Sequence, residues 1–310
     1  MKVAITGGAG YIGSILTEHL LARGDKVHVL DSLMWGDHCQ FQFCANKDYE
    51  FTYGDARDKE TVARVIKDAD VIIPLAAIVG APACKKDPLM SKQINQEAVM
   101  MCDELRSPNQ LIIYPNTNSG YGTGSGDVHC TEETPLEPIS VYGRTKCDAE
   151  IGLLEKDNVI TFRLATVFGA SPRMRIDLLV NHFTYAALTD GYIVVFEKDF
   201  KRNYIHIRDV ADAMIHGIEN SKAMSGKPYN LGLDAANLSK QELCEKIQKH
   251  VPNFFVHYAE IGEDPDKRDY IVSNQRLQEA GFTAQRGLDD GIQELIKAYS
   301  TLGLNRYRNA

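Results

Sequence analysis

The amino-acid sequence predicts a doubly wound α/β fold, a parallel sheet covered by helices on both faces, followed by a smaller lobe. Three observations lead to this prediction. Short apolar runs alternate with segments of helical periodicity over residues 1–170 of the 310. Most of these runs are apolar throughout, as expected of strands that are buried on both faces. Beyond residue 170 the alternation loosens, which favours a separate lobe over the edge of the sheet.

The first elements follow from apolar spacing and from glycine. KVAITGG (2–8) is a short apolar run that ends in glycine, which predicts a strand and a turn. The segment 11–24 places apolar residues at helical intervals and stops at a glycine, so we expect a helix there. KVHVLD (26–31) predicts a second strand that ends in an acid. A third short strand is expected within 48–58.

The middle of the chain continues the same alternation. KETVARVIKDA (59–69) predicts a helix, and DVIIPLAA (70–77) predicts a buried fourth strand. The next helix is expected over 91–107. A fifth strand is expected over 110–120, where an apolar run enters a polar, glycine-containing loop.

The last regular elements complete the predicted sheet and suggest where it ends. A long helix is expected over 141–156 and a sixth strand over 158–169. We therefore expect a sheet-containing domain over 1–170, with return segments near 200–220, and a second lobe over 171–310. Neither an internal repeat nor a low-complexity linker separates the two.

Composition excludes several classes of protein. With 44% hydrophobic and 25% charged residues, the chain is typical of a globular protein, and its net charge of −8 argues against binding to nucleic acid. The seven cysteines form no C-x-x-C pair, so we expect reduced thiols and no metal site. There is no leader-like segment and no apolar run that would span a bilayer. These features predict a cytoplasmic protein that does not contact membranes.

The stretch TGGAGYIG predicts a dinucleotide site. Gly7, Gly10 and Gly13 follow a predicted strand and open a predicted helix, where glycine lets the backbone approach a pyrophosphate. Asp31 ends the next strand and can accept hydrogen bonds from the hydroxyls of an adenosine ribose. A carboxylate there would repel a 2′-phosphate, and no arginine follows closely in DSLMWGD. The pattern therefore favours NAD over NADP.

A second group of residues predicts acid/base chemistry. Tyr142 and Lys146 are four residues apart in VYGRTK, so they lie on one face of the predicted helix. A neighbouring lysine cation favours the phenolate form of tyrosine, which can then take a proton from a substrate hydroxyl. Thr117, at the end of the fifth strand, offers a hydroxyl that can hold the substrate oxygen. Asn118 and Ser119 beside it are equally consistent with a substrate role and with hydrogen bonds inside the loop.

These motifs together resemble the nucleotide-sugar epimerase/dehydratase family of extended short-chain dehydrogenases/reductases, which have a Rossmann domain and a C-terminal substrate-binding lobe. The similarity runs through TGGAGYIG, GDARD, LAA, NTNSGYG, VYGRTK and RNYIHIRDVADA. It implies an NAD-dependent enzyme with Thr117, Tyr142 and Lys146 as catalytic residues. The resemblance implies that the cofactor-binding residues are Gly7, Gly10, Tyr11, Ile12, Gly13, Asp31, Asp55, Ala56, Leu75, Ala76, Ala77 and Lys146.

The resemblance also implies a nucleotide-diphosphate sugar as substrate. Arg202 and Arg268 occupy the positions that grip the diphosphate, which suits the fixed charge and paired donors of arginine. Thr166 stands where the family carries asparagine. The segment TNS at 117–119 replaces the Thr-Asp-Glu of the 4,6-dehydratases, and this loss of two acids argues against elimination of water.

A finer resemblance is to the GDP-heptose 4-dehydrogenases of bacterial capsule biosynthesis, through IIPLAAIVGAPACK, IYPNTNSGYG, TFRLATVFGASPRMRIDLLVN and GEDPDKRDY. It implies oxidation at C4 of a GDP-heptose to a 4-keto sugar, with Arg173 and Arg175 as candidates for substrate contact or for the surface. A 4-epimerase using the same residues is the alternative. A 4,6-dehydratase or a non-catalytic NAD-binding protein is less favoured. The helices over 91–107 and 141–156 resemble those that pair in family dimers, so we expect a homodimer or a higher homo-oligomer.

Overall fold

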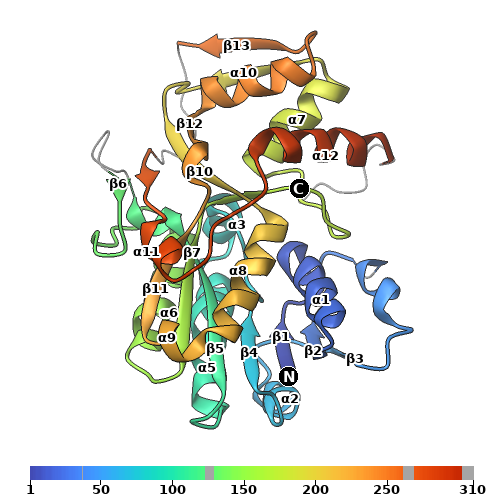
Figure 1. Cartoon of the computed structure of the whole chain (residues 1–310), viewed down its shortest axis with the longest axis vertical. Helices are drawn as coiled ribbons and strands as arrows, with labels where there is room; N and C mark the ends of the chain where they lie inside the picture. Colours follow the sequence, from blue (N-terminus) through green and yellow to red (C-terminus); the bar gives the residue numbers. More distant parts are fainter. Residues whose placement is uncertain (37, 123–128, 261–268, 302–310) are drawn as a thin grey trace.

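A seven-stranded parallel sheet forms the core of the larger part of the molecule, the lower part in Figure 1. The structure, a computed structural model, describes residues 1–36, 38–122, 129–260 and 269–301. The strands lie in the order β11-β7-β5-β4-β1-β2-β3, and every neighbouring pair is parallel. The strands are β1 (Lys2–Thr6), β2 (Lys26–Asp31), β3 (Tyr49–Tyr53), β4 (Val71–Pro74), β5 (Leu111–Thr117), β7 (Val159–Leu164) and β11 (Lys227–Leu231).

Helices cover both faces of this sheet because alternate residues of each strand point to opposite faces. In β1, Val3 and Ile5 belong to the apolar cluster under α1 (Tyr11–Arg23) and α8 (Ile207–Glu219), whereas Ala4 belongs to the cluster on the other face. That second cluster packs under α2 (Lys59–Ile66), α5 (Ala98–Leu105) and α6 (Val141–Leu154). The predicted doubly wound α/β fold is therefore confirmed.

The order of the strands locates the site. Successive strands run outward from β1 in one direction through β2 and β3, and from β4 in the other through β5, β7 and β11. In open α/β sheets, ligands bind at the carboxyl ends of the strands where this direction reverses. The glycine turn that follows β1 and the loop that follows β4 meet at this point, so the site is expected above these two strands.

One predicted helix is interrupted. The segment expected as a helix over 91–107 consists of α4 (Pro88–Lys92), a π-helical turn (Gln93–Glu97) and α5. The turn buries Asn95, whose amide accepts a hydrogen bond from the Ile78 backbone N–H at 2.8 Å and donates one to the Ile78 carbonyl at 2.9 Å. Such turns often occur at functional sites. Here the turn fixes the loop that lies between β4 and α3 (Ala81–Lys86).

The predicted sixth strand is also divided. Its first part is β7, within the main sheet, and its second part is β8 (Thr166–Phe168), which pairs with β10 (Lys201–His206) in a smaller sheet. Between them the backbone N–H of Ala165 still donates to the carbonyl of Leu231 in β11. The chain therefore leaves the main sheet at this residue and enters the lobe, a change of partner that apolar patterning alone does not reveal.

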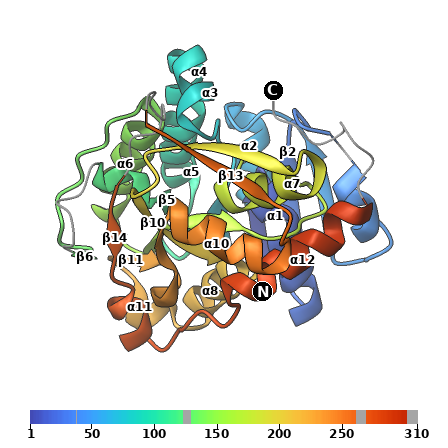
Figure 2. The ribbon, with the colours of Figure 1, turned by 90° about the horizontal axis from the view of Figure 1, so that it is seen from above.

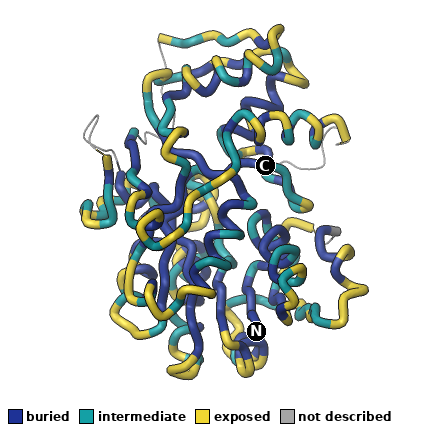
Figure 3. The backbone as a smooth tube through the Cα atoms, viewed as in Figure 1, coloured by how far each residue is buried: buried dark blue, intermediate teal, exposed yellow. Residues whose placement is uncertain are grey.

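The lobe is built from short sheets and three longer helices (Figures 1 and 2). One sheet has the order β12-β10-β8. Two further sheets each consist of one pair of parallel strands. The apolar interior of the lobe continues that of the main sheet, so the buried core runs through both parts (dark blue in Figure 3). The elements of the whole chain not yet named are β6 (His129–Cys130), β9 (Tyr192–Phe196), β12 (Asn237–Ser239), β13 (Phe255–Ala259), β14 (Ile271–Val272), α7 (Leu179–Thr189), α9 (Ser221–Met224), α10 (Lys240–His250), α11 (Gln275–Glu279), α12 (Leu288–Thr301) and the 3₁₀ turns His38–Phe43, Asn118–Tyr121 and Asp234–Ala236.

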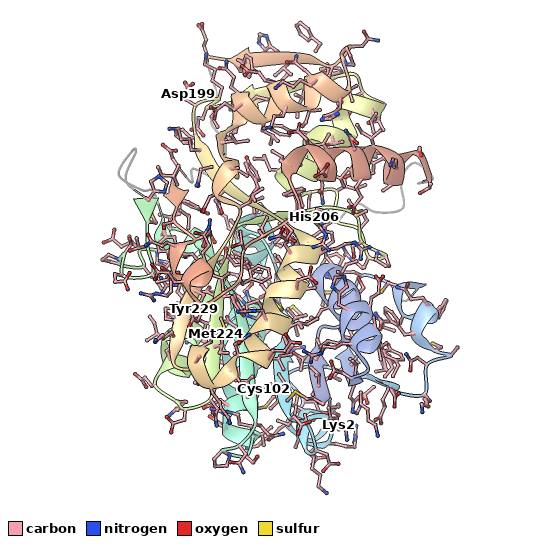
Figure 4. All side chains as sticks on the ribbon, viewed as in Figure 1. Lys2, Cys102, Asp199, His206, Met224 and Tyr229 are labelled. Atoms are coloured by element: carbon pink, nitrogen blue, oxygen red, sulfur yellow. The ribbon has the colours of Figure 1, made fainter. Side chains whose placement is uncertain are left out.

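The chain returns from the lobe to the main sheet through α8 and β11. His206, at the junction of the two parts (Figure 4), is buried and caps α8 by accepting a hydrogen bond from the Arg208 backbone N–H. Its other ring nitrogen lies 3.0 Å from the Glu294 carboxylate in α12. His206 therefore joins sheet and lobe, and its contacts are structural. Within the described part of the chain, no helix is both long and apolar enough to cross a membrane.

Candidate active site

The glycine turn between β1 and α1 packs so tightly that side chains would not fit. Gly7 has a φ of +75°, and a Cβ atom there would lie 2.5 Å from the Ala76 backbone nitrogen. A Cβ on Gly13 would lie 2.6 Å from the Cα of Gly8. Helix α1 then begins at Tyr11 without a side-chain cap from Gly10. Its first N–H groups are therefore available to an anion, which the helix dipole also favours.

Asp31 lies beside this turn at the end of β2. Its carboxylate accepts hydrogen bonds from the backbone N–H of Ala9 at 2.9 Å and from that of Leu33 at 2.8 Å. Burial raises the pKa of Asp31, while these hydrogen bonds and the positive charge of Arg173 lower it. The carboxylate thus anchors the glycine turn and still faces the pocket, where a ribose hydroxyl can donate to it.

A long pocket runs over the carboxyl ends of β1, β2, β4 and β5. Every residue predicted to bind the cofactor lies in its wall: Gly7, Gly10, Tyr11, Ile12, Gly13, Asp31, Asp55, Ala56, Leu75, Ala76, Ala77 and Lys146. The wall thus offers a glycine cradle, a helix N-terminus and a ribose acceptor, the groups that a dinucleotide requires. These residues fit NAD.

Sequence reasoning missed part of this wall. Ile78, Met90 and Ile94 give it an apolar side, and Asn116 gives it an amide. Aliphatic residues at such spacing are indistinguishable from ordinary core residues in the sequence, so no local signal marked them. Trp35, which follows Asp31 by four residues, also lines the pocket.

Tyr142 and Lys146 enter the same pocket from the first turns of α6. The helix is capped by Ser140, whose hydroxyl accepts a hydrogen bond from the Gly143 backbone N–H at 3.0 Å. Lys146 is buried, and its ammonium lies 4.1 Å from the centre of the Tyr114 ring. Burial lowers the pKa of Lys146 to about 7, against the opposing charges of Cys147 and Glu150. Phenol and amine therefore line the same pocket as the glycine turn.

A buried ion pair lies one turn further along α6. Glu150 is fully buried and accepts hydrogen bonds from Arg163 at 2.8 Å, Asn116 at 2.9 Å and Thr161 at 3.0 Å. Asn116 also lines the pocket. The pair therefore connects α6 to the strands β5 and β7 and fixes the orientation of the helix.

Thr117 ends β5 and caps the short turn that follows it. Its hydroxyl lies 2.8 Å from that of Ser119 and accepts a hydrogen bond from the Ser119 backbone N–H. Asn118 is 1% exposed, and neither atom of its amide has a hydrogen-bond partner among the described residues. A buried amide without a partner costs about 1–3 kcal/mol, so its presence favours a ligand at this turn.

The other residues predicted to contact substrate lie in three places. Thr166 begins β8, and Arg202 is buried in β10, both outside the wall of the cofactor pocket as the described residues define it. Arg173 and Arg175 line that pocket, near Asp31 and Tyr11. Arg268 lies outside the described residues.

Comparison with known proteins agrees with this geometry. Residues 3–232 match the model of the NAD dependent epimerase/dehydratase family. A UDP-glucose 4-epimerase of Lactobacillus helveticus is 29% identical over 296 residues, covering 86% of this chain and 87% of its own. The low-salt glycan biosynthesis protein Agl12 of Haloferax volcanii is 26% identical over 310 residues, covering 96% of this chain and 98% of its own.

Solved structures share the fold at lower identity. A UDP-glucose 4-epimerase from Thermotoga maritima, solved with UDP-glucose, superimposes with a TM-score of 0.84 at 21% identity, covering 97% of this chain and 99% of that one. A dTDP-glucose 4,6-dehydratase from Bacillus anthracis, solved with NAD, gives 0.83 at 23% identity, covering 97% and 96%. With its glycine turn, Asp31 and the Tyr142–Lys146 pair around one pocket, this chain is an NAD-dependent enzyme that belongs to the NAD dependent epimerase/dehydratase family.

Proposed function

We propose that the protein oxidises C4 of a nucleotide-linked sugar to give a 4-keto sugar. The observation that carries this proposal is the position of Tyr142 and Lys146 in the wall of the pocket that also contains the glycine turn. When bound, NAD supplies the hydride acceptor for such an oxidation. The protein must then hold the sugar hydroxyl beside the phenol and take up its proton.

The residues of the chain divide this work. Tyr142 accepts the proton of the sugar hydroxyl, and Lys146, four residues further along the same helix, stabilises the phenolate when its amine is protonated. Thr117 orients the substrate oxygen from the end of β5. The unpartnered amide of Asn118 supports a substrate contact at the same turn, because a bound sugar would offer it hydroxyl groups.

Two candidate functions differ in the fate of the 4-keto sugar. In a dehydrogenase the keto sugar leaves, and the long segments that resemble GDP-heptose 4-dehydrogenases support this outcome, with a GDP-heptose as substrate and a role in capsule biosynthesis. In a 4-epimerase the keto sugar rotates within the pocket and is then reduced on its other face. The curated relatives named as UDP-glucose and UDP-arabinose 4-epimerases favour this second candidate. A 4,6-dehydratase is disfavoured by the neutral residues Asn118 and Ser119.

The deciding experiment mixes the NAD-loaded enzyme with a panel of nucleotide sugars that includes a GDP-heptose and UDP-glucose. The absorbance of NADH and the chromatographic identity of the sugar are followed together. A rise in NADH with a 4-keto product supports net oxidation. Conversion of one sugar to its C4 epimer without NADH accumulation supports the 4-epimerase. Neither change with any sugar, in an enzyme shown to hold NAD, would contradict both candidates.

We also propose that the site spans two regions, an NAD-binding domain over 1–170 with return segments and a sugar-binding lobe over 171–310. Arg202 and Arg268 would hold the diphosphate, with Thr166 nearer the sugar. A homodimer formed through α5 and α6 accords with Ile151 of α6, which is 54% exposed. Light scattering on the wild type and on Ile151→Glu tests this, because the substitution should release monomers if α6 forms the interface.

A further inference from the structure

Arg173 and Trp35 meet in the wall of the cofactor pocket. The guanidinium carbon of Arg173 lies 5.3 Å from the centre of the Trp35 ring, within the range of a cation–π interaction. Both residues line the pocket, yet they come from different parts of the chain. Trp35 follows β2, whereas Arg173 lies between β8 and α7. The contact therefore joins two parts of the pocket wall that are far apart in the sequence.

The segment that carries Arg173 is fixed to helix α1, which follows the glycine turn. The hydroxyl of Ser171 donates to the Tyr11 carbonyl at 2.8 Å and lies 2.9 Å from the hydroxyl of Ser14. The amide of Asn181 donates to the Arg175 carbonyl at 2.8 Å. These bonds hold residues 171–175 against the N-terminal turn of α1, so Arg173 projects from a rigid base.

The side chains on the Trp35 side of the contact are more exposed. Trp35 is 51% exposed, and Met34 beside it is 49% exposed. Leu33, just before them in the chain, has a φ of +52°, a backbone conformation that is uncommon for a residue other than glycine. Large apolar side chains that stay this exposed beside a pocket suggest a surface that a ligand covers. Trp35 is therefore the movable half of the contact.

Charge favours an anionic ligand beside this contact. Arg173 and Arg175 both line the pocket, and burial, followed by the charge of Arg175, lowers the pKa of Arg173. Asp177 pairs with Arg175 at 2.6 Å, yet the charge of Arg175 still disfavours that of Arg173, and an anionic ligand would offset this effect. Asp31 faces the same end of the pocket, where the adenosine ribose of a dinucleotide binds.

We propose that Arg173 and Trp35 form a clasp over the adenosine half of bound NAD and set the rate at which the cofactor leaves. Closing the clasp stacks the guanidinium on the indole above the ligand, and opening it breaks that contact. Arg173 is then a cofactor residue and not a sugar residue. The inference depends on NAD binding alone, so it stands or falls independently of which sugar the enzyme converts.

The test measures release of the cofactor. The protein is loaded with NADH and mixed with a large excess of NAD, and the fluorescence of bound NADH is followed. Trp35→Ala and Arg173→Ala should each speed release about tenfold, the scale of one partly desolvated cation–π contact. The double variant should be no faster than the faster single variant, because both substitutions break one interaction.

Matched controls separate the clasp from general effects. Phe41→Ala removes an aromatic ring that is 67% exposed and lies outside the described pocket wall, and Arg64→Ala removes an exposed arginine on α2. Both should release NADH at the wild-type rate. Trp35→Phe and Arg173→Lys keep a weaker contact and should accelerate release about two- to threefold, which keeps the test valid if an alanine variant does not fold.

Two results would overturn the proposal. If the effects of the single variants multiply in the double variant, the two residues act separately and there is no clasp. If Arg173→Ala leaves NADH release unchanged but raises the KM for the nucleotide sugar, Arg173 belongs to the substrate site, one of the two roles that the sequence resemblance leaves open.

Discussion

The ammonium of Lys146 lies 4.1 Å from the centre of the Tyr114 ring, and the lysine, which lines the pocket, is only 4% exposed. Burial disfavours the charged amine and lowers its pKa to about 7, while the ring face partly compensates for lost water. The lysine is therefore poised to change its protonation near neutral pH, and ligands in the pocket will shift that balance.

This burial predicts how stability depends on pH. The pKa of Lys146 is lower in the folded chain than in the unfolded chain, where it is about 10.4. The protonated lysine therefore destabilises the fold fully below about pH 7, and the cost shrinks as pH rises toward the unfolded value. Lys146→Met should raise the free energy of unfolding by about 2–4 kcal/mol at pH 6 and by less at pH 9.

Urea denaturation of the NAD-free protein at both pH values measures this difference. Lys67→Met, which changes an exposed lysine just after α2, serves as the control and should have the same small effect at both. An equal gain at pH 6 and pH 9 for Lys146→Met would mean that the amine is not destabilising as a charge.

The acid/base assignment predicts a separation of binding from turnover. Tyr142→Phe removes the hydroxyl but keeps the ring in the pocket wall. Turnover should fall about 100- to 10,000-fold, the usual contribution of a positioned acid or base, while NAD affinity stays close to that of the wild type. Tyr53→Phe, which alters an exposed tyrosine, should leave both unchanged. Surviving activity in Tyr142→Phe would assign the proton transfer to another group.

The ion pair between Glu150 and Arg163 predicts a large loss of stability when one partner is neutralised. Glu150→Gln leaves a buried guanidinium without its carboxylate and should lower the free energy of unfolding by about 3 kcal/mol. The double variant Glu150→Gln with Arg163→Met removes both charges and should recover part of the loss. Chemical denaturation of the three proteins measures the coupling, and additive losses would show that the charges act independently.

The carboxylate of Asp31 leads us to predict a preference for NAD over NADP. Its carboxylate repels a 2′-phosphate, while Arg173 supplies a positive charge at the same end of the pocket. Asp31→Ser should weaken NAD binding and strengthen NADP binding, shifting their ratio by about 10- to 100-fold. Trp35 is the only tryptophan of the chain and lines the pocket, so quenching of intrinsic fluorescence measures both affinities. An unchanged ratio would show that Asp31 does not face the ribose.

Local sequence was sufficient for six strands of the seven-stranded main sheet and for the glycine and acidic residues of the cofactor wall, but it missed β11. Gly7, Gly13 and Asp31 carry requirements of backbone and charge that depend on their immediate neighbours, and each lies where its pattern predicts. Prediction from local sequence failed where an element depends on contacts with residues that are distant in the chain. The break at Ala165 depends on pairing with β11, and the π turn depends on the contact between Asn95 and Ile78.

The role of Arg173 is the clearest case of such a distant partner. The absence of an arginine near Asp31 in the sequence favoured NAD, yet the fold brings Arg173 to the same end of the pocket from more than a hundred residues away. Apolar wall residues such as Met90 and Ile94 were missed for a different reason, since their pattern is that of any core helix.

The late position of β11 in the chain has a consequence for synthesis on the ribosome. All six residues of β7 are buried, and one side of that strand is covered only when β11 pairs with it. A nascent chain that has not yet released residues 227–231 therefore presents an open sheet edge flanked by apolar side chains. Such edges pair readily with other chains. Prolonged pausing of translation before β11 should thus promote aggregation, until this strand covers the buried strand β7.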